Sequence, residues 1–185
     1  MRIVAISGSL RKASYNRSIL FALAEVAPVG MALEIQPIAE IPFFNQDVEA
    51  QGIPEPVQRL RDAVAAADGL LVATPEYNAG TTGVLKNTID WLSRPAAESV
   101  LKGKPTGLVG VTPGQLGTAR AQGQLRAAFE FAAAPVMPSP QVFVNRAREK
   151  FDADGRLTDE KTRDFLGTFM VAFERWVRRN SPDSP

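Results

Sequence analysis

Hydroxyls and two adjacent cations crowd the loop that follows the first apolar run of the chain, in the stretch SGSLRKASYN of residues 7–16. Hydroxyl and cationic side chains, with backbone N–H groups freed by Gly8, are donors suited to a phosphate. A helix expected to begin near Asn16, as its N-cap, would add the positive end of its dipole. No acid lies between Met1 and Ala24. The loop predicts a phosphate site, and a solvated polar turn is the alternative.

Two better-known phosphate motifs do not fit this chain. No Gly-Lys pair is followed by Ser or Thr, so the P-loop pattern is absent. The G-x-G-x-x-G fingerprint does not follow the first apolar run, and no acid ends the second run to bind a ribose. A mononucleotide is therefore a better expectation than a dinucleotide cofactor.

Two further loops have unusual composition. Residues 75–78, Pro-Glu-Tyr-Asn, follow the apolar run LLVAT and offer an aromatic ring beside amide donors and acceptors. Such a set could line a planar heteroaromatic ring, although an ordinary Pro-initiated turn is the alternative. Residues 112–119, TPGQLGTA, add small residues that allow close approach of a ligand.

The composition excludes several kinds of catalysis. The chain has no histidine and no cysteine, so Ser-His-Asp triads, histidine zinc centres and thiolate chemistry are ruled out. If the protein is an enzyme, a cofactor is expected to supply the chemistry, with no catalytic side chain and no metal site. Lys and Arg total 21 against 20 acids, which gives no general attraction for nucleic acid or anionic lipid.

The length of 185 residues suits one domain, expected over residues 1–180, with a disordered tail at 181–185. The apolar run at 3–6 is too short for a signal-peptide core, and no stretch approaches the roughly 18 residues of a membrane span. We therefore expect a cytoplasmic protein without a membrane partner.

Strand and helix patterns alternate along the chain. Short apolar runs predict strands at 2–7, 32–38, 70–74, 105–112 and 141–144. Apolar residues at helical spacing predict helices near 16–27, 54–67, 82–93, 118–133 and 158–179. On these helices we expect Phe165, Phe169 and Phe173 in the core, an Asp90–Arg94 surface ion pair, and Trp91 as a packing residue.

This alternation predicts an α/β fold, a doubly wound parallel sheet with helices on both faces. In the flavodoxin-like order 2-1-3-4-5, which we expect for this sheet, strands 1 and 3 flank the point where the order reverses. Loops that leave the carboxyl ends of parallel strands emerge at one edge, and ligands bind there where the strand order reverses. The three unusual loops follow the first, third and fourth strands. They are therefore expected to converge on one site.

At these loops the sequence resembles the NADPH-dependent FMN reductase family, which includes bacterial quinone, azo-dye and chromate reductases. The resemblance rests on GSLRKASYN, on ADGLLVATPEYNAGTTGVLKNTIDWLSR and on GKPTGLVGVTPGQLGTARAQGQLR, and covers most of residues 3–126. Two glycines depart from the family pattern. Gly80 stands where relatives often have serine, and Gly123 stands where some have an aromatic residue associated with tetramer contacts.

The resemblance implies non-covalently bound FMN, with NADPH or NADH as hydride donor. It implies that the phosphate is held by Ser9, Arg11, Ser14 and Asn16. The flavin ring would be contacted, largely through backbone groups, by Pro75, Glu76, Tyr77 and Asn78, with Val111 and Thr112 on its other side.

The implied activity is ping-pong, two-electron reduction of small-molecule acceptors: quinones, azo dyes, chromate or free flavin. The resemblance also implies a homodimer, with a tetramer as the alternative. Two other functions stay open at this point: a flavodoxin-type electron carrier that oxidises no nicotinamide, and a non-catalytic flavin sensor. Such carriers are typically strongly acidic, and the net charge of +1 argues against that reading.

Overall fold

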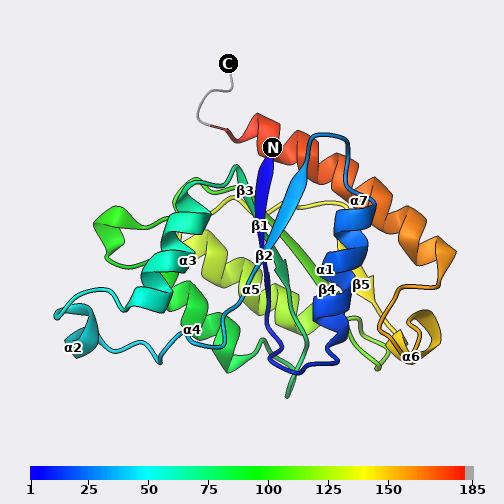
Figure 1. Ribbon diagram of the computed structural model, residues 1–185, viewed down its shortest axis with the longest axis horizontal. Helices are drawn as coiled ribbons and strands as arrows, with labels where there is room; N and C mark the ends of the chain where they lie inside the picture. The colour runs from blue at the N-terminus through cyan, green and yellow to red at the C-terminus, as the bar shows by residue number, and fades with distance from the viewer. Residues whose placement is uncertain (182–185) are drawn as a thin grey trace.

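The computed structural model, which describes residues 1–181, has a five-stranded parallel sheet in the order β2-β1-β3-β4-β5. Figure 1 shows the strands running side by side through the centre of the molecule. Their bounds are β1 (Arg2–Ser7), β2 (Ala32–Gln36), β3 (Gly69–Ala73), β4 (Thr106–Val111) and β5 (Val142–Val144). The predicted fold class and strand order are confirmed, and each strand lies within two residues of its predicted bounds.

The long helices match the predicted ones, and shorter ones occur between them. The long helices are α1 (Tyr15–Glu25), α3 (Glu55–Ala65), α4 (Gly83–Leu92), α5 (Ala119–Phe131) and α7 (Glu160–Arg179). The short ones are α2 (Gln46–Glu49), α6 (Ala147–Lys150) and the 3₁₀ helix η1 (Ala96–Glu98). Sequence reasoning missed the short helices because three or four residues are too few to show a helical period.

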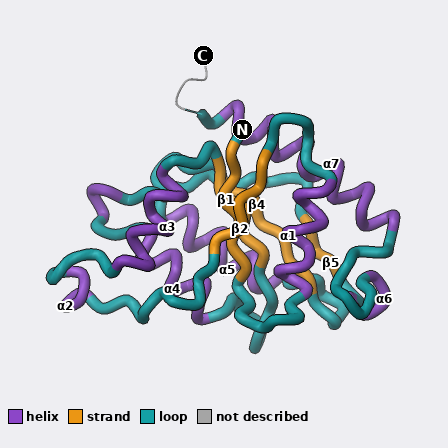
Figure 2. Tube along the Cα trace, in the orientation of Figure 1, coloured by secondary structure: helices purple, strands orange, loops and turns teal. Residues whose placement is uncertain are grey.

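Helices cover both faces of the sheet (Figure 2). On one face, Ile3 and Ala5 of β1 pack with α1 and α7, whereas Val4 and Ile6 on the other face pack with α3, α4 and α5. Because both faces are buried, the central strands read as continuous apolar runs rather than alternating patterns.

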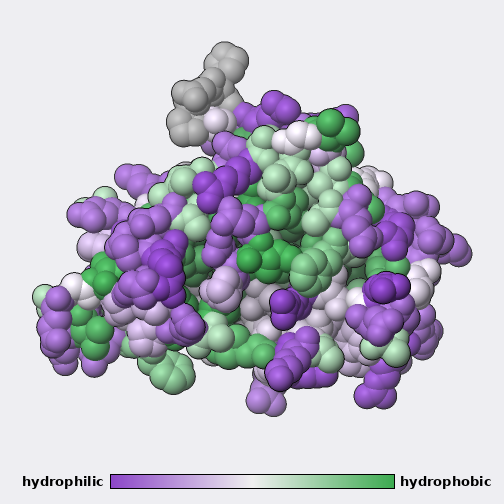
Figure 3. All heavy atoms as spheres, in the orientation of Figure 1, coloured by the Kyte–Doolittle hydropathy of each residue, from purple (hydrophilic) through white to green (hydrophobic). Residues whose placement is uncertain are grey.

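The edge strand β2 is only partly covered. Figure 3 shows hydrophobic residues gathered in the middle of this face of the molecule, over β2, with hydrophilic side chains over the helices on either side. Partial exposure explains why the β2 sequence alternates and Pro37 follows its last residue, Gln36.

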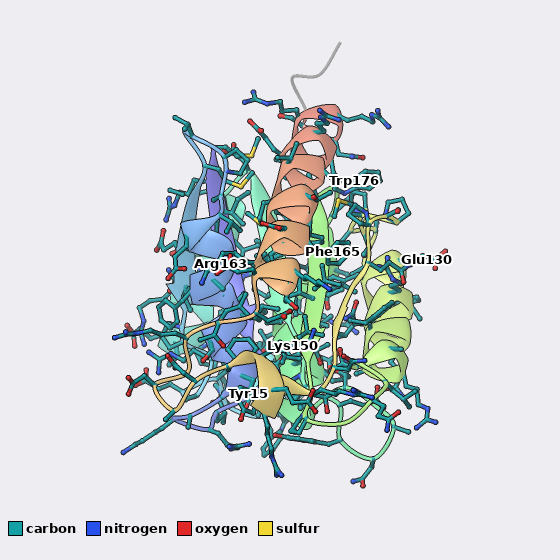
Figure 4. All side chains as sticks on the ribbon, turned by 90° about the vertical axis from the view of Figure 1, so that its right-hand side faces the viewer. Tyr15, Glu130, Lys150, Arg163, Phe165 and Trp176 are labelled. Atoms are coloured by element: carbon teal, nitrogen blue, oxygen red, sulfur yellow. The ribbon has the colours of Figure 1, made fainter. Side chains whose placement is uncertain are left out.

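The long helix α7 is attached to its neighbours by polar contacts along its length (Figure 4). Trp176 donates its indole N–H to the Pro135 carbonyl at 3.2 Å, and the Arg163 guanidinium pairs with Glu25 of α1 at 2.8 Å. Near its start, Lys150 Nζ donates to Thr162 Oγ1 at 3.0 Å.

Three predictions about side chains were wrong. Phe165 is 40% exposed, whereas Phe169 and Phe173 are buried, because a four-residue spacing drifts by about 40° per step around a helix. Asp90 pairs with Lys86 at 2.6 Å, since α4 ends at Leu92 and leaves Arg94 beyond the helix. The N-cap of α1 is Ser14, whose Oγ accepts from the Arg17 N–H. The cap residue is thus two positions before Asn16.

Other expectations can be placed as well. Trp91 is buried and donates its indole N–H to the Pro42 carbonyl at 2.8 Å, as expected of a packing residue. Within residues 1–181 no helix is both long and apolar enough to cross a lipid bilayer. Of the predicted tail at 181–185, only Ser181 lies among the described residues.

Candidate functional site

Three loops meet at the carboxyl edge of the sheet, at the lower end of the strands in Figure 1. They are residues 8–14 after β1, residues 74–82 after β3 and residues 112–118 after β4. In the observed strand order β1 and β3 are neighbours and β4 lies beside β3, so all three loops adjoin. The predicted convergence is confirmed.

The first and second loops are joined at Gly8. Its N–H donates to the Ala73 carbonyl at 2.8 Å, and its carbonyl accepts from Thr82 Oγ1 at 2.9 Å. A Cβ at this position would lie 2.3 Å from Cδ1 of the buried Leu85, so a larger residue would require Leu85 of α4 to move. Thr82 also caps α4 by accepting from the Leu85 N–H. Sequence reasoning missed Thr82, although its place directly before Gly83 is a typical N-cap signal.

Asn16 joins the first loop to β4. Its Nδ2 donates to the Val111 carbonyl and its Oδ1 accepts from the Val111 N–H, both at 2.9 Å, and the side chain is buried. The Asn16 amide thus pairs with the Val111 backbone as the backbone of a neighbouring strand would. This amide was predicted at the phosphate, and in the structure its nitrogen and oxygen both bind the backbone of Val111.

Residues 77–80 form a tight turn at the tip of the second loop. The Tyr77 N–H donates to the Gly80 carbonyl and the Gly80 N–H to the Tyr77 carbonyl, both at 3.0 Å. Asn78 and Ala79 between them have φ angles of 50° and 60°, which is the pattern of a type I′ turn. Asparagine tolerates this left-handed region, whereas alanine is strained in it. The turn leaves Tyr77 and Asn78 exposed at the sheet edge.

The Glu76 carboxylate binds the N-terminus of α5. Oε2 accepts from the backbone N–H groups of Arg120 at 3.0 Å and Ala121 at 3.2 Å, and the side chain is only 12% exposed. Thr118, the residue at the cap position of α5, is left-handed and makes no side-chain capping bond. Glu76 therefore caps α5 from another loop. Its side chain is committed to the protein, which leaves its backbone for a ligand.

The third loop is held by the neighbouring strand. The Thr112 N–H donates to the Val144 carbonyl at 3.0 Å, and Thr112 Oγ1 accepts from the Gly114 N–H at 3.2 Å. Val111 and Thr112 thus lie at the end of β4, next to the loop that contains Pro75. The structure brings these predicted ring residues to the same edge.

Cations surround the first loop. Arg11, Lys12 and Arg17 are exposed, and they line a cavity of about 380 Å³ between this loop and the end of β2. Ser9 is half-buried in the loop, whereas Ser14 is buried and its hydroxyl caps α1. The first turn of α1 leaves N–H groups without acceptors in the helix, as every helix start does. Arg17 was not predicted, although it lies in the same acid-free stretch.

A second cavity, of about 540 Å³, lies on the other side of the first loop. Its wall is largely apolar and includes Leu10, Phe43, Tyr77 and Val84. Phe43 comes from the loop after β2 and was not predicted, because no local pattern brings that loop to the site. The edge thus offers phosphate donors on one side and an apolar, aromatic wall on the other. The donors suit the phosphate of FMN, and the apolar, aromatic wall suits its isoalloxazine ring.

The comparisons with known proteins agree with this geometry. The family model for NADPH-dependent FMN reductases matches residues 1–149. The chain is 45% identical to an NAD(P)H-dependent FMN reductase, PA1204, from Pseudomonas aeruginosa, over 97% of its own length and 96% of the relative. It is 38% identical to a 2-hydroxy-1,4-benzoquinone reductase from a Burkholderia species, over 96% of this chain and 97% of the relative.

The same result comes from a solved structure. FerB, a flavoenzyme NAD(P)H:(acceptor) oxidoreductase from Paracoccus denitrificans, has a TM-score of 0.90 and 36% identity, and the match covers 97% of this chain and 98% of FerB. The fold and its carboxyl edge define a flavodoxin-like protein. More specifically, the chain belongs to the NADPH-dependent FMN reductase family.

Proposed function

We propose that the protein is an NAD(P)H-dependent FMN oxidoreductase that reduces quinones or similar small-molecule acceptors. The observation that supports this most directly is the meeting of three loops at one sheet edge, where the cations of the first loop line a cavity of about 380 Å³. The names of relatives across the full chain support the same activity.

The proposed phosphate site divides its residues by role. Arg11 and Ser9 bind the phosphate directly, together with backbone N–H groups of the loop and of the first turn of α1. Ser14 and Asn16 act mainly by holding α1 in place, because their buried side chains already have partners in the protein. Lys12 and Arg17 add positive potential around the anion.

The proposed ring site is mainly a backbone site. Residues 75–78 contact one side of the isoalloxazine, and Val111 and Thr112 line the other. When bound here, FMN would supply the hydride chemistry that links NADPH or NADH to the acceptor. The chain contributes binding and orientation, and we assign no side chain as general acid or base. This fits a sequence without histidine or cysteine.

We propose that residues 1–180 act as one FMN-binding domain and that two copies form a homodimer, with a tetramer as the alternative. Leu10, Phe43 and Tyr77 are 53%, 83% and 51% exposed beside the 540 Å³ cavity, which favours a covering partner. Light scattering on the purified protein tests the oligomeric state. We also propose a cytoplasmic location, where reduced nicotinamides are available.

An anaerobic titration tests the proposed function. The purified protein, reconstituted with FMN, is mixed with NADPH or NADH while the flavin absorbance near 450 nm is followed. Bleaching supports a reductase, and recovery of the colour on addition of a quinone completes the cycle. A flavin that stays oxidised with both nicotinamides would indicate an electron carrier or a sensor. A protein that takes up no FMN would overturn the proposal altogether.

Steady-state kinetics then identify the acceptor. Quinones, an azo dye, chromate and free flavin are compared with both nicotinamides, and parallel lines in double-reciprocal plots indicate the ping-pong order.

A further inference from the structure

Gln124, on the second turn of α5, reaches the loop between β3 and α4. Its Oε1 accepts a hydrogen bond from the Thr81 N–H at 3.0 Å. The same side chain fills the space next to Gly80. A Cβ built on Gly80 would lie 2.7 Å from Oε1 and 3.0 Å from Nε2 of Gln124. Gln124 therefore occupies the volume that a side chain at position 80 would need.

The loop is thus attached to α5 at two points, one on each side of its turn. Glu76 precedes the turn and binds the Arg120 and Ala121 N–H groups. Thr81 follows the turn and donates to Gln124. The turn between these points contains Ala79 at a φ of 60°, a conformation that an alanine does not hold without support.

We propose that Gln124 is a positioning residue for the flavin ring. By holding the Thr81 N–H it fixes the loop, so that the backbone of residues 75–79 meets the isoalloxazine in one arrangement. The proposal rests on the proposed function, because it assigns this loop to the ring. The attachment itself is a property of the protein and can be measured without flavin.

The same contact accounts for Gly80, where the family resemblance leads one to expect serine. A serine at position 80 and a glutamine at position 124 exclude each other in the observed geometry. Since the clashing atoms are the end of a flexible side chain, G80S should displace Gln124 rather than break the loop. Its effect should then pass through the loss of the Gln124–Thr81 hydrogen bond.

The test compares Q124A with Q124E, which keeps an acceptor oxygen at the same reach. Q58A is the matched control, because Gln58 is an exposed glutamine on α3 whose amide donates only to Asp62 within its own helix. The first measurement is amide hydrogen exchange at Thr81 in the flavin-free protein. The second is the FMN dissociation constant with the visible spectrum and midpoint potential of the bound flavin.

In Q124A we expect faster exchange at Thr81 and FMN binding weaker by roughly 3- to 10-fold, the range for one neutral hydrogen bond. A shifted flavin spectrum or potential would distinguish positioning from a loss of stability. Q124E should keep the wild-type exchange at Thr81, because its carboxylate can accept the same hydrogen bond, and Q58A should match the wild type in both measurements. G80S should weaken FMN binding like Q124A, and the double variant G80S/Q124A should be no weaker than either single variant.

Three results would overturn the proposal: Q124A with wild-type exchange at Thr81, Q124A with wild-type flavin affinity and spectrum, or Q124E with exchange at Thr81 as fast as in Q124A. Failure of the proposed function looks different. If the wild-type protein binds no FMN, the loop has no flavin ring to contact. The exchange data for Thr81 would still show whether Gln124 holds the loop in place.

Discussion

The side-chain amide of Asn16 and the backbone of Val111, 95 residues apart in sequence, form two reciprocal hydrogen bonds of 2.9 Å. Both residues were expected at the flavin. The structure shows that they bind each other, and that this contact fixes the start of α1 relative to the end of β4. The two ends of the proposed cofactor site are therefore coupled through one buried side chain.

Asn16→Ala is expected to destabilise the flavin-free protein by about 1–3 kcal/mol, because it leaves the buried N–H and carbonyl of Val111 without partners. Urea unfolding measures the change. Asn45→Ala is the control, since Asn45 caps only the exposed four-residue helix α2 and should cost less. Unchanged stability of Asn16→Ala, with FMN binding lost, would instead favour a direct contact with the phosphate.

Arg11→Ala should behave in the opposite way. Its side chain is exposed and donates a long 3.4 Å hydrogen bond to the Ala13 carbonyl, so the free energy of unfolding should barely change. FMN affinity should fall by about 1.5–3 kcal/mol, the range for a hydrogen bond to a charged group. Fluorescence titration of FMN measures the affinity. Lys102→Ala is the control, because Lys102 is an exposed cation in the loop before β4. Equal affinities for wild type and Arg11→Ala would refute the phosphate role.

Glu76→Ala should destabilise the protein by about 1 kcal/mol, the typical value for a lost helix cap. Glu76→Gln keeps an acceptor for the Arg120 and Ala121 N–H groups and should recover most of this loss. Thermal unfolding follows both variants, and turnover with a quinone should stay mostly intact in Glu76→Gln. A fall in turnover of more than about a hundredfold, or roughly 2.7 kcal/mol of barrier, would make Glu76 a candidate proton donor.

Asp159, the N-cap of α7, gives the protein a pH-dependent contribution to stability. The Thr162 hydroxyl and N–H, together with the nearby Lys150, lower the pKa of this carboxyl. A lowered pKa in the folded state means that the contribution is present above the ordinary pKa near 4 and is lost as the pH falls through the folded value.

Asp159→Ala should therefore be less stable than the wild type by about 1 kcal/mol at pH 7. The difference should shrink steadily below about pH 4 as the wild-type carboxyl becomes protonated. Asp159→Asn keeps a capping oxygen without the charge and should show a flatter pH dependence. Unfolding curves between pH 2 and 7 test this, and a constant difference across that range would contradict it.

Local patterns predicted most of the fold correctly. Each strand is a short apolar run and each long helix has a repeating apolar face, and these signals depend only on neighbours in sequence. The helical period was a poorer guide to whether a single side chain is buried. Phe165 shares the spacing of Phe169 and Phe173 but lies outside the buried stripe, because the contact face of α7 is set by the sheet and α1.

The candidate site was predicted in outline for the same reason. Strand order brings the loops after β1, β3 and β4 to one edge, so composition at loop positions was enough to locate it. Individual roles were not predictable from the residue types. Ser14 and Glu76 have side chains suited to a ligand, yet they cap α1 and α5.

The sequence by itself determined the strands, the long helices and the loops of unusual composition, because apolar periodicity and turn residues act over short distances along the chain. Only the tertiary structure decided which polar side chains face a ligand and which hold the protein together. Asn16, Glu76 and Gln124 find their partners 40 to 100 residues away, at Val111, Arg120 and Thr81. Hydrogen bonds of this kind depend on how distant segments pack, which no local pattern specifies.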